Sequence, residues 1–128
     1  MPLARLFNPR GVAFVGAVPD RERYAGRTVE YCLGGGFRGA IYPVNPKFRT
    51  VFGHPCYPSL DDVPGPVDVV VVLVGPSRIP DLLDQCRRLG IGFAIAFGDL
   101  VEPGAGREDR QGIRIWRFSA TLGLRRGV

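Results

Sequence analysis

The sequence lacks any apolar run long enough to cross a membrane. Its longest apolar stretch, Val67–Val74, is interrupted by Asp68, whereas a membrane helix needs about 20 apolar residues. The first residues also lack the long apolar segment that marks a secretory signal. We therefore expect a cytoplasmic protein with no membrane partner.

Cysteine pairs with metal-binding or redox spacing are absent as well. The three cysteines, Cys32, Cys56 and Cys86, are widely spaced and form no CxxC motif, so neither a zinc site nor a redox dithiol is indicated. Reduced thiols are the ordinary state in the cytosol. The Asp61-Asp62 pair offers too few oxygen ligands for a dedicated metal cage, and we predict no metal site.

Histidine and lysine occur once each, as His54 and Lys47. His54 is followed two residues later by Cys56, but no acid in the sequence nearby would orient the imidazole, so a nucleophile–base pair is not indicated. The sequence also has no GxxxxGK[ST] loop for a triphosphate and no GxGxxG turn. We therefore predict no catalytic residue.

The net charge of +5 is carried almost entirely by arginine, since 16 of the 17 basic residues are Arg. From Val101 onward, six arginines accompany three acidic residues. A basic segment is one sign of nucleic-acid binding, but an arginine excess this uniform is more typical of genome composition. The interleaved aromatic residues of a single-strand platform are also missing, so no nucleic-acid partner is predicted.

The apolar segments that are present alternate between strand and helix patterns. Short apolar runs predict strands at 11–16, 40–44, 67–74 and 91–97, and helical spacing predicts helices at 24–33 and 77–90. In the second helix, Leu89 is expected on the buried face with Ile79, Leu82, Leu83 and Cys86. Strands that alternate with helices predict an α/β, Rossmann-like fold, a parallel sheet with flanking helices.

The connections carry further expectations. Pro43 lacks an N–H, so the second strand is expected to leave the regular ladder near it. Residues 45–60 are expected to form a loop, with Ser59 capping a short helical turn through Val63. We place the Rossmann-like domain at 1–98 and a divergent segment at 99–128, which is partly disordered or adds one more strand at 112–116. The connection to that strand barely reaches the dozen residues that a parallel crossover needs.

A ligand site is predicted beyond the carboxyl ends of the strands, where parallel α/β sheets bind their ligands. Segments 16–18, 45–47 and 75–77 follow three of the strands and should converge. The helix that begins near Tyr24 adds free N–H groups, and Arg21, Arg23 and Arg27 add positive charge. The predicted binding residues are Gly16, Ala17, Val18, Arg23, Tyr24, Gly26, Asn45, Pro46, Lys47, Val74, Gly75 and Pro76.

The segment after the second strand discriminates among nucleotide ligands. NAD-binding domains usually place an acid there to bind the ribose hydroxyls, but this sequence reads Val44-Asn45-Pro46-Lys47. A cation suits a phosphorylated ribose, such as the 3′-phosphate of coenzyme A or the 2′-phosphate of NADP. A solvated loop lysine is the alternative interpretation.

Several linked motifs resemble one family. They are Leu6–Ala17 (LFNPRGVAFVGA), Gly36–Gly39 (GFRG), Ile41–Lys47 (IYPVNPK), Gly53–Leu60 (GHPCYPSL) and Pro66–Asp68 (PVD). In this order and spacing they resemble the N-terminal CoA-binding domain of nucleoside-diphosphate-forming acyl-CoA synthetases, also called ADP-forming acetate–CoA ligases. The resemblance covers about 3–97, and the succinyl-CoA synthetase α-subunit is a more distant relative.

The resemblance implies a crevice for coenzyme A or acyl-CoA, with 16–18 along the phosphates, 45–47 at the phosphorylated adenosine, and 74–76 against the ligand. It also implies companion synthetase subunits, because the family's phosphohistidine and nucleotide-binding domains do not fit in 128 residues. Val18 stands where the family commonly has serine, and Gly75-Pro76 replaces Pro-Ala. The alternatives are an NADP-binding oxidoreductase domain and a non-catalytic remnant or regulatory interaction domain.

Overall fold

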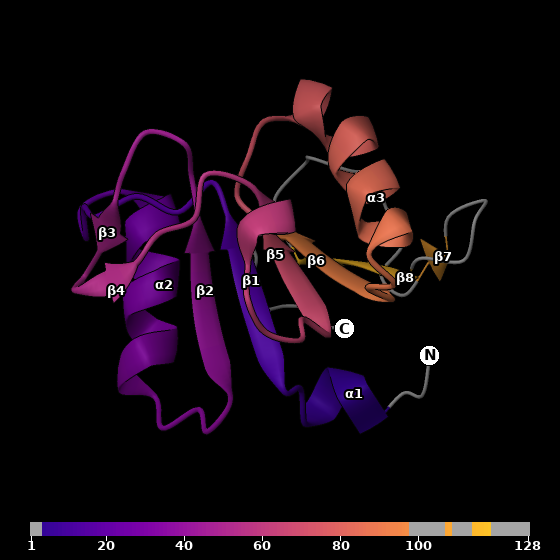
Figure 1. Ribbon diagram of the computed structural model, residues 1–128, viewed down its shortest axis with the longest axis horizontal. Coiled ribbons are helices and arrows are strands. Elements are labelled where there is room, and N and C mark those ends of the chain that lie inside the picture. Colours follow the sequence, from indigo (N-terminus) through magenta and orange to yellow (C-terminus); the bar gives the residue numbers. More distant parts are fainter. Residues whose placement is uncertain (1–3, 98–106, 109–113, 119–128) are drawn as a thin grey trace.

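The computed structural model describes residues 4–97, 107–108 and 114–118, and its centre is one twisted sheet (Figure 1). The sheet has six strands in the order β2-β1-β5-β6-β8-β7, of which all are parallel except β7. This arrangement confirms the predicted Rossmann-like fold. The strands are β1 (Gly11–Val15), β2 (Ala40–Val44), β5 (Val69–Val72), β6 (Phe93–Phe97), β7 (Arg107–Glu108) and β8 (Arg114–Phe118).

Helices cover both faces of this sheet. One face packs against α2 (Tyr24–Gly34) through Phe14, Val29 and Val71. The other packs against α3 (Ile79–Arg88) and the 3-10 turn η1 (Leu60–Asp62). A second 3-10 turn, η2 (Pro76–Arg78), leads into α3, and a short helix, α1 (Ala4–Phe7), precedes β1. None of the described helices is both long and apolar enough to span a membrane.

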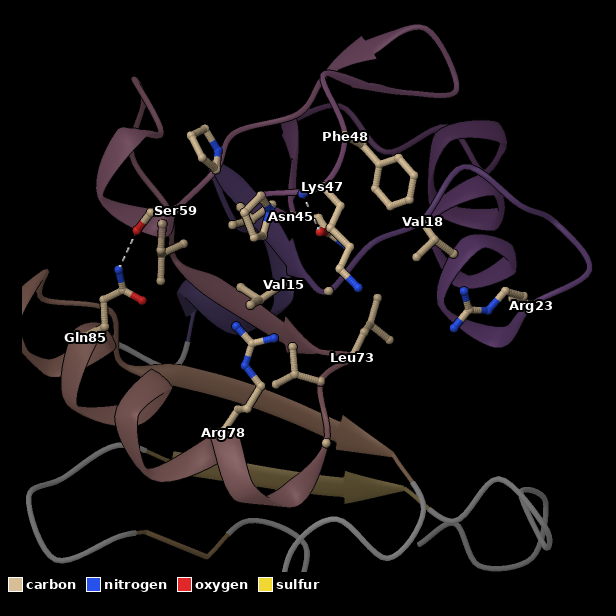
Figure 2. A pocket seen from close by; sticks show the side chains of 17 residues that line it. Val15, Val18, Arg23, Asn45, Lys47, Phe48, Ser59, Leu73, Arg78 and Gln85 are labelled. Atoms are coloured by element: carbon tan, nitrogen blue, oxygen red, sulfur yellow. Dashed lines mark hydrogen bonds between the residues drawn. The ribbon is translucent and has the colours of Figure 1, made fainter.

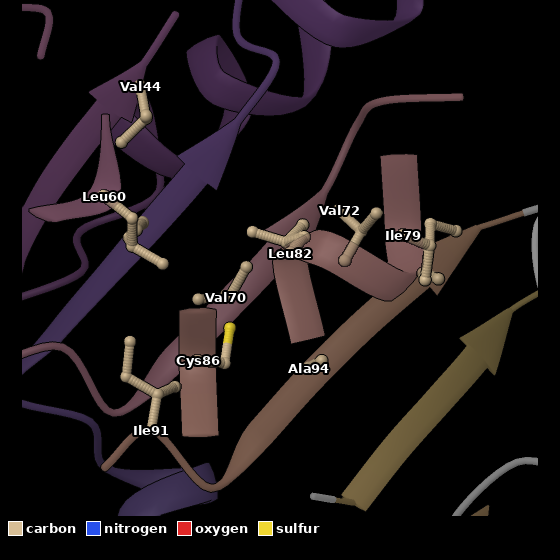
Figure 3. Packing of buried hydrophobic residues seen from close by; sticks show 11 residues of the cluster. Val44, Leu60, Val70, Val72, Ile79, Leu82, Cys86, Ile91 and Ala94 are labelled. Carbon is tan, nitrogen blue, oxygen red and sulfur yellow. The ribbon is translucent and has the colours of Figure 1, made fainter. Parts of the chain in front are cut away.

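The strand β5 lies in the middle of this three-layer packing. Its four valines are all buried. Val70 and Val72 pack on the α3 side (Figure 3), whereas Val71 belongs to the cluster on the α2 side. A strand that is covered on both faces has no solvent-facing position to alternate with. This explains the continuous apolar run in the sequence.

The second strand ends one residue after Pro43, close to the point where it is expected to leave the ladder, but Pro43 itself stays in register with Phe14. β2 stays in register with β1 through Val44, whose carbonyl oxygen accepts from the N–H of Gly16 at 2.8 Å. The carbonyl of Pro43 points the other way and accepts from Tyr57 N–H at 3.0 Å. Because β2 is the edge strand, the N–H that proline lacks would lie on the outer side, where the β1 ladder does not need it.

The expected loop at 45–60 contains a small antiparallel hairpin, formed by β3 (Thr50–Val51) and β4 (His54–Pro55). Its two turn residues, Phe52 and Gly53, both have positive φ, at 49° and 81°, as a tight hairpin turn requires. The sequence has no Asn-Gly or Asp-Gly pair there, so the hairpin carried no turn signal.

Of two detailed predictions about the helical segments, one is confirmed and one is wrong. The cap at Ser59 is confirmed, since its Oγ accepts from the N–H of Asp61 at 3.3 Å. The expectation for Leu89 is wrong, because α3 ends at Arg88 and 42% of Leu89 is exposed. Ile79, Leu82 and Cys86 are buried as expected.

The C-terminal part is described only in its strands. β8 pairs in parallel with β6 and overlaps residues 112–116, for which the sequence pattern indicates a strand. Residues 112 and 113 lie outside the described residues. The division of the chain at residue 98 stays a prediction.

An ion pair between the buried Asp68 and the half-exposed Arg10 closes the amino-terminal edge of the sheet. The Asp68 side chain is fully buried and accepts from the backbone N–H of Arg10 at 2.7 Å, from its Nε at 3.0 Å and from its Nη2 at 2.7 Å. The hydrogen bonds from Arg10 outweigh burial and lower the pKa of Asp68. Asp68 N–H also donates to the carbonyl of Gly11 at 3.0 Å. The pair therefore joins the starts of β1 and β5.

Candidate functional site

The carboxyl ends of β1, β2 and β5 open into a cleft of about 450 Å³ (Figure 2). The three segments that the sequence singled out therefore converge on one space, as the parallel topology requires. The cleft is lined by Val15, Gly16, Val18, Arg23, Val44, Asn45, Pro46, Lys47, Phe48, Pro58, Ser59, Leu60, Leu73, Val74, Gly75, Arg78 and Gln85.

Most of the predicted binding residues are in this lining, but Ala17 and Gly26 are not. Ala17 is fully buried, and Gly26 packs so closely against the loop before α2 that a side chain would collide with its backbone carbonyls. Tyr24 and Pro76 are the first residues of α2 and η2, and their side chains lie outside the part of the chain that the structure describes. The ligand-binding role of all these residues stays a prediction.

Gly16 lies at the point where β1 enters the cleft. Its φ of +100° is one that other residues rarely adopt, and an added Cβ would lie 2.8 Å from the carbonyl oxygen of Leu73. Glycine is therefore required for two reasons, the backbone conformation and the close approach of the chain that follows β5.

The Asn45 side chain connects two of the converging segments. Its Nδ2 donates to the carbonyl oxygen of Ala17 at 3.0 Å, and its Oδ1 accepts from the N–H of Lys47 at 2.9 Å. The Asn45 N–H donates to Tyr57 O at 2.9 Å. Asn45 therefore fixes the position of the Lys47 loop relative to the first turn.

The described charges in the cleft are all of one sign. Arg23, Lys47 and Arg78 line it, and no Asp or Glu among the residues that the structure describes does. Figure 2 shows these three side chains approaching the same space from three different segments. None of the ion pairs in the described part of the chain involves any of them. Such a cleft attracts anions, because no carboxylate offsets its field.

Arg21 and Arg27 were expected to add charge to the cleft, but they do not line it. Arg21 forms an ion pair with Glu30 at 2.8 Å and lies over the ring of Phe52, 5.8 Å from its centroid. Arg27 is exposed on α2 and does not line the cleft. Only Arg23 of the three lines it.

Arg78 and Gln85 are lining residues that the sequence did not reveal. Gln85 Nε2 donates to Ser59 Oγ at 2.9 Å and to Asp61 at 3.2 Å, and Arg88 Nη1 binds Asp61 at 2.9 Å. The hydrogen bond from Arg88 lowers the pKa of Asp61. This network ties α3 to η1 and so fixes the wall opposite Lys47. In the sequence, the helical pattern of 77–90 was the one sign that these residues could form a wall of the cleft.

Among the described side chains, the lining contains no Asp, Glu, His or Cys, the groups that most often act as a general acid or base. His54 lies on β4, exposed and away from the cleft. Burial raises the pKa of Cys86 to about 12 and also raises that of Cys56, whose Sγ donates to Asn45 O at 3.5 Å. Both thiols are therefore protonated and unreactive at neutral pH. Within the described ranges no group of three His, Cys, Asp or Glu could hold a metal ion.

The sequence of this chain is similar to a known protein family and to known ligases. A family model described as a CoA binding domain matches residues 10–117. The ADP-forming acetate–CoA ligase I of Archaeoglobus fulgidus is 32% identical over 126 residues, which are 98% of this chain and 18% of the ligase. The α-subunit of the ADP-forming acetate–CoA ligase II of Pyrococcus furiosus is 34% identical over 113 residues, 85% of this chain and 24% of the subunit.

Solved structures agree. An acetyl-coenzyme A synthetase of Candidatus Korarchaeum cryptofilum, in complex with phosphate and ADP, superposes with a TM-score of 0.70 at 38% identity, over 73% of this chain and 20% of the synthetase. A hypothetical protein of Pyrococcus horikoshii gives 0.73 at 30% identity, over 89% of this chain and 80% of that protein. This chain thus spans less than a quarter of the length of the ligases and most of a much smaller protein. It belongs to the CoA-binding domain family, in the form found in ADP-forming acetate–CoA ligases.

Proposed function

We propose that the cleft binds coenzyme A, with Lys47 at the 3′-phosphate. The observation that carries the proposal is the charge of the lining, in which Arg23, Lys47 and Arg78 are accompanied by no acid from residues 4–97, 107–108 or 114–118. Coenzyme A bears a diphosphate and a 3′-phosphate, so it presents anionic groups at two separate places. An acid-free cleft with cations on different walls matches that distribution.

The residues around Lys47 and Gly16 support this orientation of coenzyme A in the cleft. Asn45 holds the loop that carries Lys47, and this loop follows β2, where a Rossmann-type domain meets the ribose. Gly16 lets the backbone approach a phosphate closely. Val18 is buried and offers no hydroxyl, so we expect phosphate binding to depend on the cationic side chains more than on side-chain hydroxyls.

Calorimetric titration with coenzyme A, NADPH and NAD, run side by side, tests the proposal. The same basic loop would suit the 2′-phosphate of NADP, so a preference for NADPH would support an oxidoreductase domain instead. Absence of binding to all three would indicate a remnant or an interaction domain. We expect binding of coenzyme A, weak binding of NADPH and none of NAD.

Replacing Lys47 with alanine should weaken coenzyme A binding about tenfold or more and leave dephospho-CoA binding unchanged. A charge-assisted contact to phosphate contributes roughly 1.5–3 kcal/mol. Dephospho-CoA lacks the 3′-phosphate, so its affinity does not include this contact. Titration of both ligands against both proteins measures the effect. Arg49→Ala is the matched control, because Arg49 is an exposed cation two residues away that does not line the cleft. Equal affinity of the wild type for the two ligands would contradict this placement.

We further propose that the chain is the CoA-binding part of an ADP-forming acyl-CoA synthetase and works with companion subunits. The relatives named above support this role, although their reactions involve much longer chains. The present sequence has no glycine-rich triphosphate loop, and its single histidine lies outside the cleft. A phosphoryl carrier and a nucleotide site would have to come from outside these 128 residues.

The purified chain is accordingly expected to bind coenzyme A but to form no acyl-CoA from acid, coenzyme A and ATP or GTP. Binding energy toward one substrate cannot lower the barrier of the coupled reaction without a phosphoryl intermediate. A hydroxamate assay measures product on the chain alone and with candidate partner subunits. Turnover by the chain alone that disappears in His54→Ala would refute the expectation.

A further inference from the structure

Arg78 is a cation of the cleft whose position is not explained by the helix that it begins. It is the last residue of η2 and directly precedes α3, its backbone is helical (φ −97°, ψ −7°), and its side chain makes no capping hydrogen bond. A cation there lies near the positive end of the helix dipole. The charge of Arg78 therefore does not stabilise α3.

A second arginine at the start of a helix also lines the cleft. Arg23 is the N-cap residue of α2 and likewise makes no side-chain capping hydrogen bond. Both helices that begin at the cleft thus start with an arginine whose side chain lines it. Residues that break a local rule without structural compensation are expected at functional positions.

The two arginines lie on different sides of the cleft. In Figure 2, Arg78 extends from the α3 side and Arg23 from the α2 side, and Lys47 reaches in between them from the β2 loop. Arg78 also lines a neighbouring cleft of about 420 Å³, in which Asp81 and Asp84 are present. In the described structure it pairs with neither acid, although both lie on its own helix. Its charge is therefore available to a ligand in the acid-free cleft.

We infer that Arg78 and Arg23 bind the diphosphate of coenzyme A from opposite sides, while Lys47 binds the 3′-phosphate. The inference rests on the proposed function, since it assigns the phosphates of the same ligand. A guanidinium presents a planar fork of donors that matches two phosphate oxygens, whereas a lysine ammonium acts as a point charge. Arginine therefore suits the diphosphate, with its several adjacent oxygens, and lysine suits the terminal phosphate.

The assignment predicts that ligands carrying only one of the two phosphate groups respond to different substitutions. Dephospho-CoA keeps the diphosphate and loses the 3′-phosphate, whereas 3′-AMP keeps the 3′-phosphate and loses the diphosphate. Arg78→Ala should weaken coenzyme A and dephospho-CoA by the same factor, about tenfold or more, and leave 3′-AMP unchanged. Arg23→Ala should give the same pattern, and Lys47→Ala the reverse pattern.

Calorimetric or NMR titration of the three ligands against these variants measures the pattern, and thermal unfolding of each unliganded variant gives an independent readout. Arg78→Ala should leave the midpoint of unfolding unchanged or raise it, because a cation is removed from a helix N-terminus. Arg78→Lys should recover part of the affinity for coenzyme A. The matched control is Arg38→Ala, which removes the same charge from an exposed position outside the cleft.

The outcomes separate this inference from the proposal beneath it. If the wild type binds coenzyme A and Arg78→Ala binds it equally well, the inference is overturned and the proposed function stands. Equal weakening of all three ligands, or a lowered midpoint of the unliganded variant, would show that Arg78 only shapes the cleft. If the wild type fails to bind coenzyme A, the proposed function itself is wrong.

Discussion

Replacing Gly16 with alanine should destabilise the protein by roughly 3 kcal/mol or more and remove most of its affinity for coenzyme A. A non-glycine residue held at an unfavourable positive φ costs about 1–3 kcal/mol. The added Cβ would also lie 2.8 Å from Leu73 O and 3.0 Å from Val74 Cγ1. Relieving this collision means moving the chain that follows β5, at a further cost of about 1–3 kcal/mol. That chain forms one wall of the cleft, so stability and binding should fall together.

Urea unfolding and titration with coenzyme A measure the two effects, with Gly75→Ala as the control for stability. Gly75 lines the same cleft, but its φ is not positive and a Cβ there would meet nothing within 4 Å. The control should unfold at nearly the wild-type urea concentration. If Gly16→Ala were as stable as Gly75→Ala, the backbone at this turn would differ from the one described.

Asp68→Ala should lower the free energy of unfolding by about 3 kcal/mol at neutral pH without changing the affinity for coenzyme A. The fully buried carboxylate accepts three hydrogen bonds from Arg10, and removing one partner of a buried pair costs about 3–5 kcal/mol. The lower end applies, because half of the Arg10 side chain is exposed and water can hydrate it. Asp68 lies at the edge of the sheet opposite the cleft, so binding should be unaffected. Denaturation and titration of the same samples measure both.

The same residue should make the stability of the wild type depend on pH. The folded state lowers the pKa of Asp68 below its ordinary value of 3.8. The stabilisation is therefore complete above that value and is lost as the pH falls through the lower pKa of the folded state. Urea unfolding from pH 5 down to about pH 2 should show this loss in the wild type and much less of it in Asp68→Ala. Asp62→Ala, which removes an exposed acid, should follow the wild type; identical slopes in all three proteins would disprove the assignment to Asp68.

The sequence predicted the layers of the fold because each element is bounded by a strong local signal. β1 ends before Gly16, α2 ends among three glycines at 34–36, and β2 has its predicted bounds. The convergence of three segments on one cleft followed from topology alone, since parallel strands place their carboxyl ends at the same edge. The family resemblance is confirmed by the match to residues 10–117.

What could not be predicted depends on contacts between distant residues. The hairpin of β3 and β4 is only two residues long on each side, too short for a periodic pattern. Whether an arginine lines the cleft depends on where its side chain is held, so Arg21 and Arg23 could not be distinguished before the pair with Glu30 was seen. Arg78 was hidden for the same reason, because a helical pattern locates a helix more reliably than its first residue.

The proline in β2 also has a consequence for how this chain meets other chains. β2 is an outermost strand of the sheet, and exposed outer strands are templates for addition of a foreign strand and for aggregation. Here Pro43 has no donor to offer, and the neighbouring backbone groups are already bonded to Tyr57, whose N–H and carbonyl serve Pro43 and Asn45. An incoming strand would have to displace Tyr57 and would still leave one of its own acceptors unpaired. This margin of the sheet is thereby protected against intermolecular β-pairing, and replacing Pro43 with a β-branched residue would remove part of that protection.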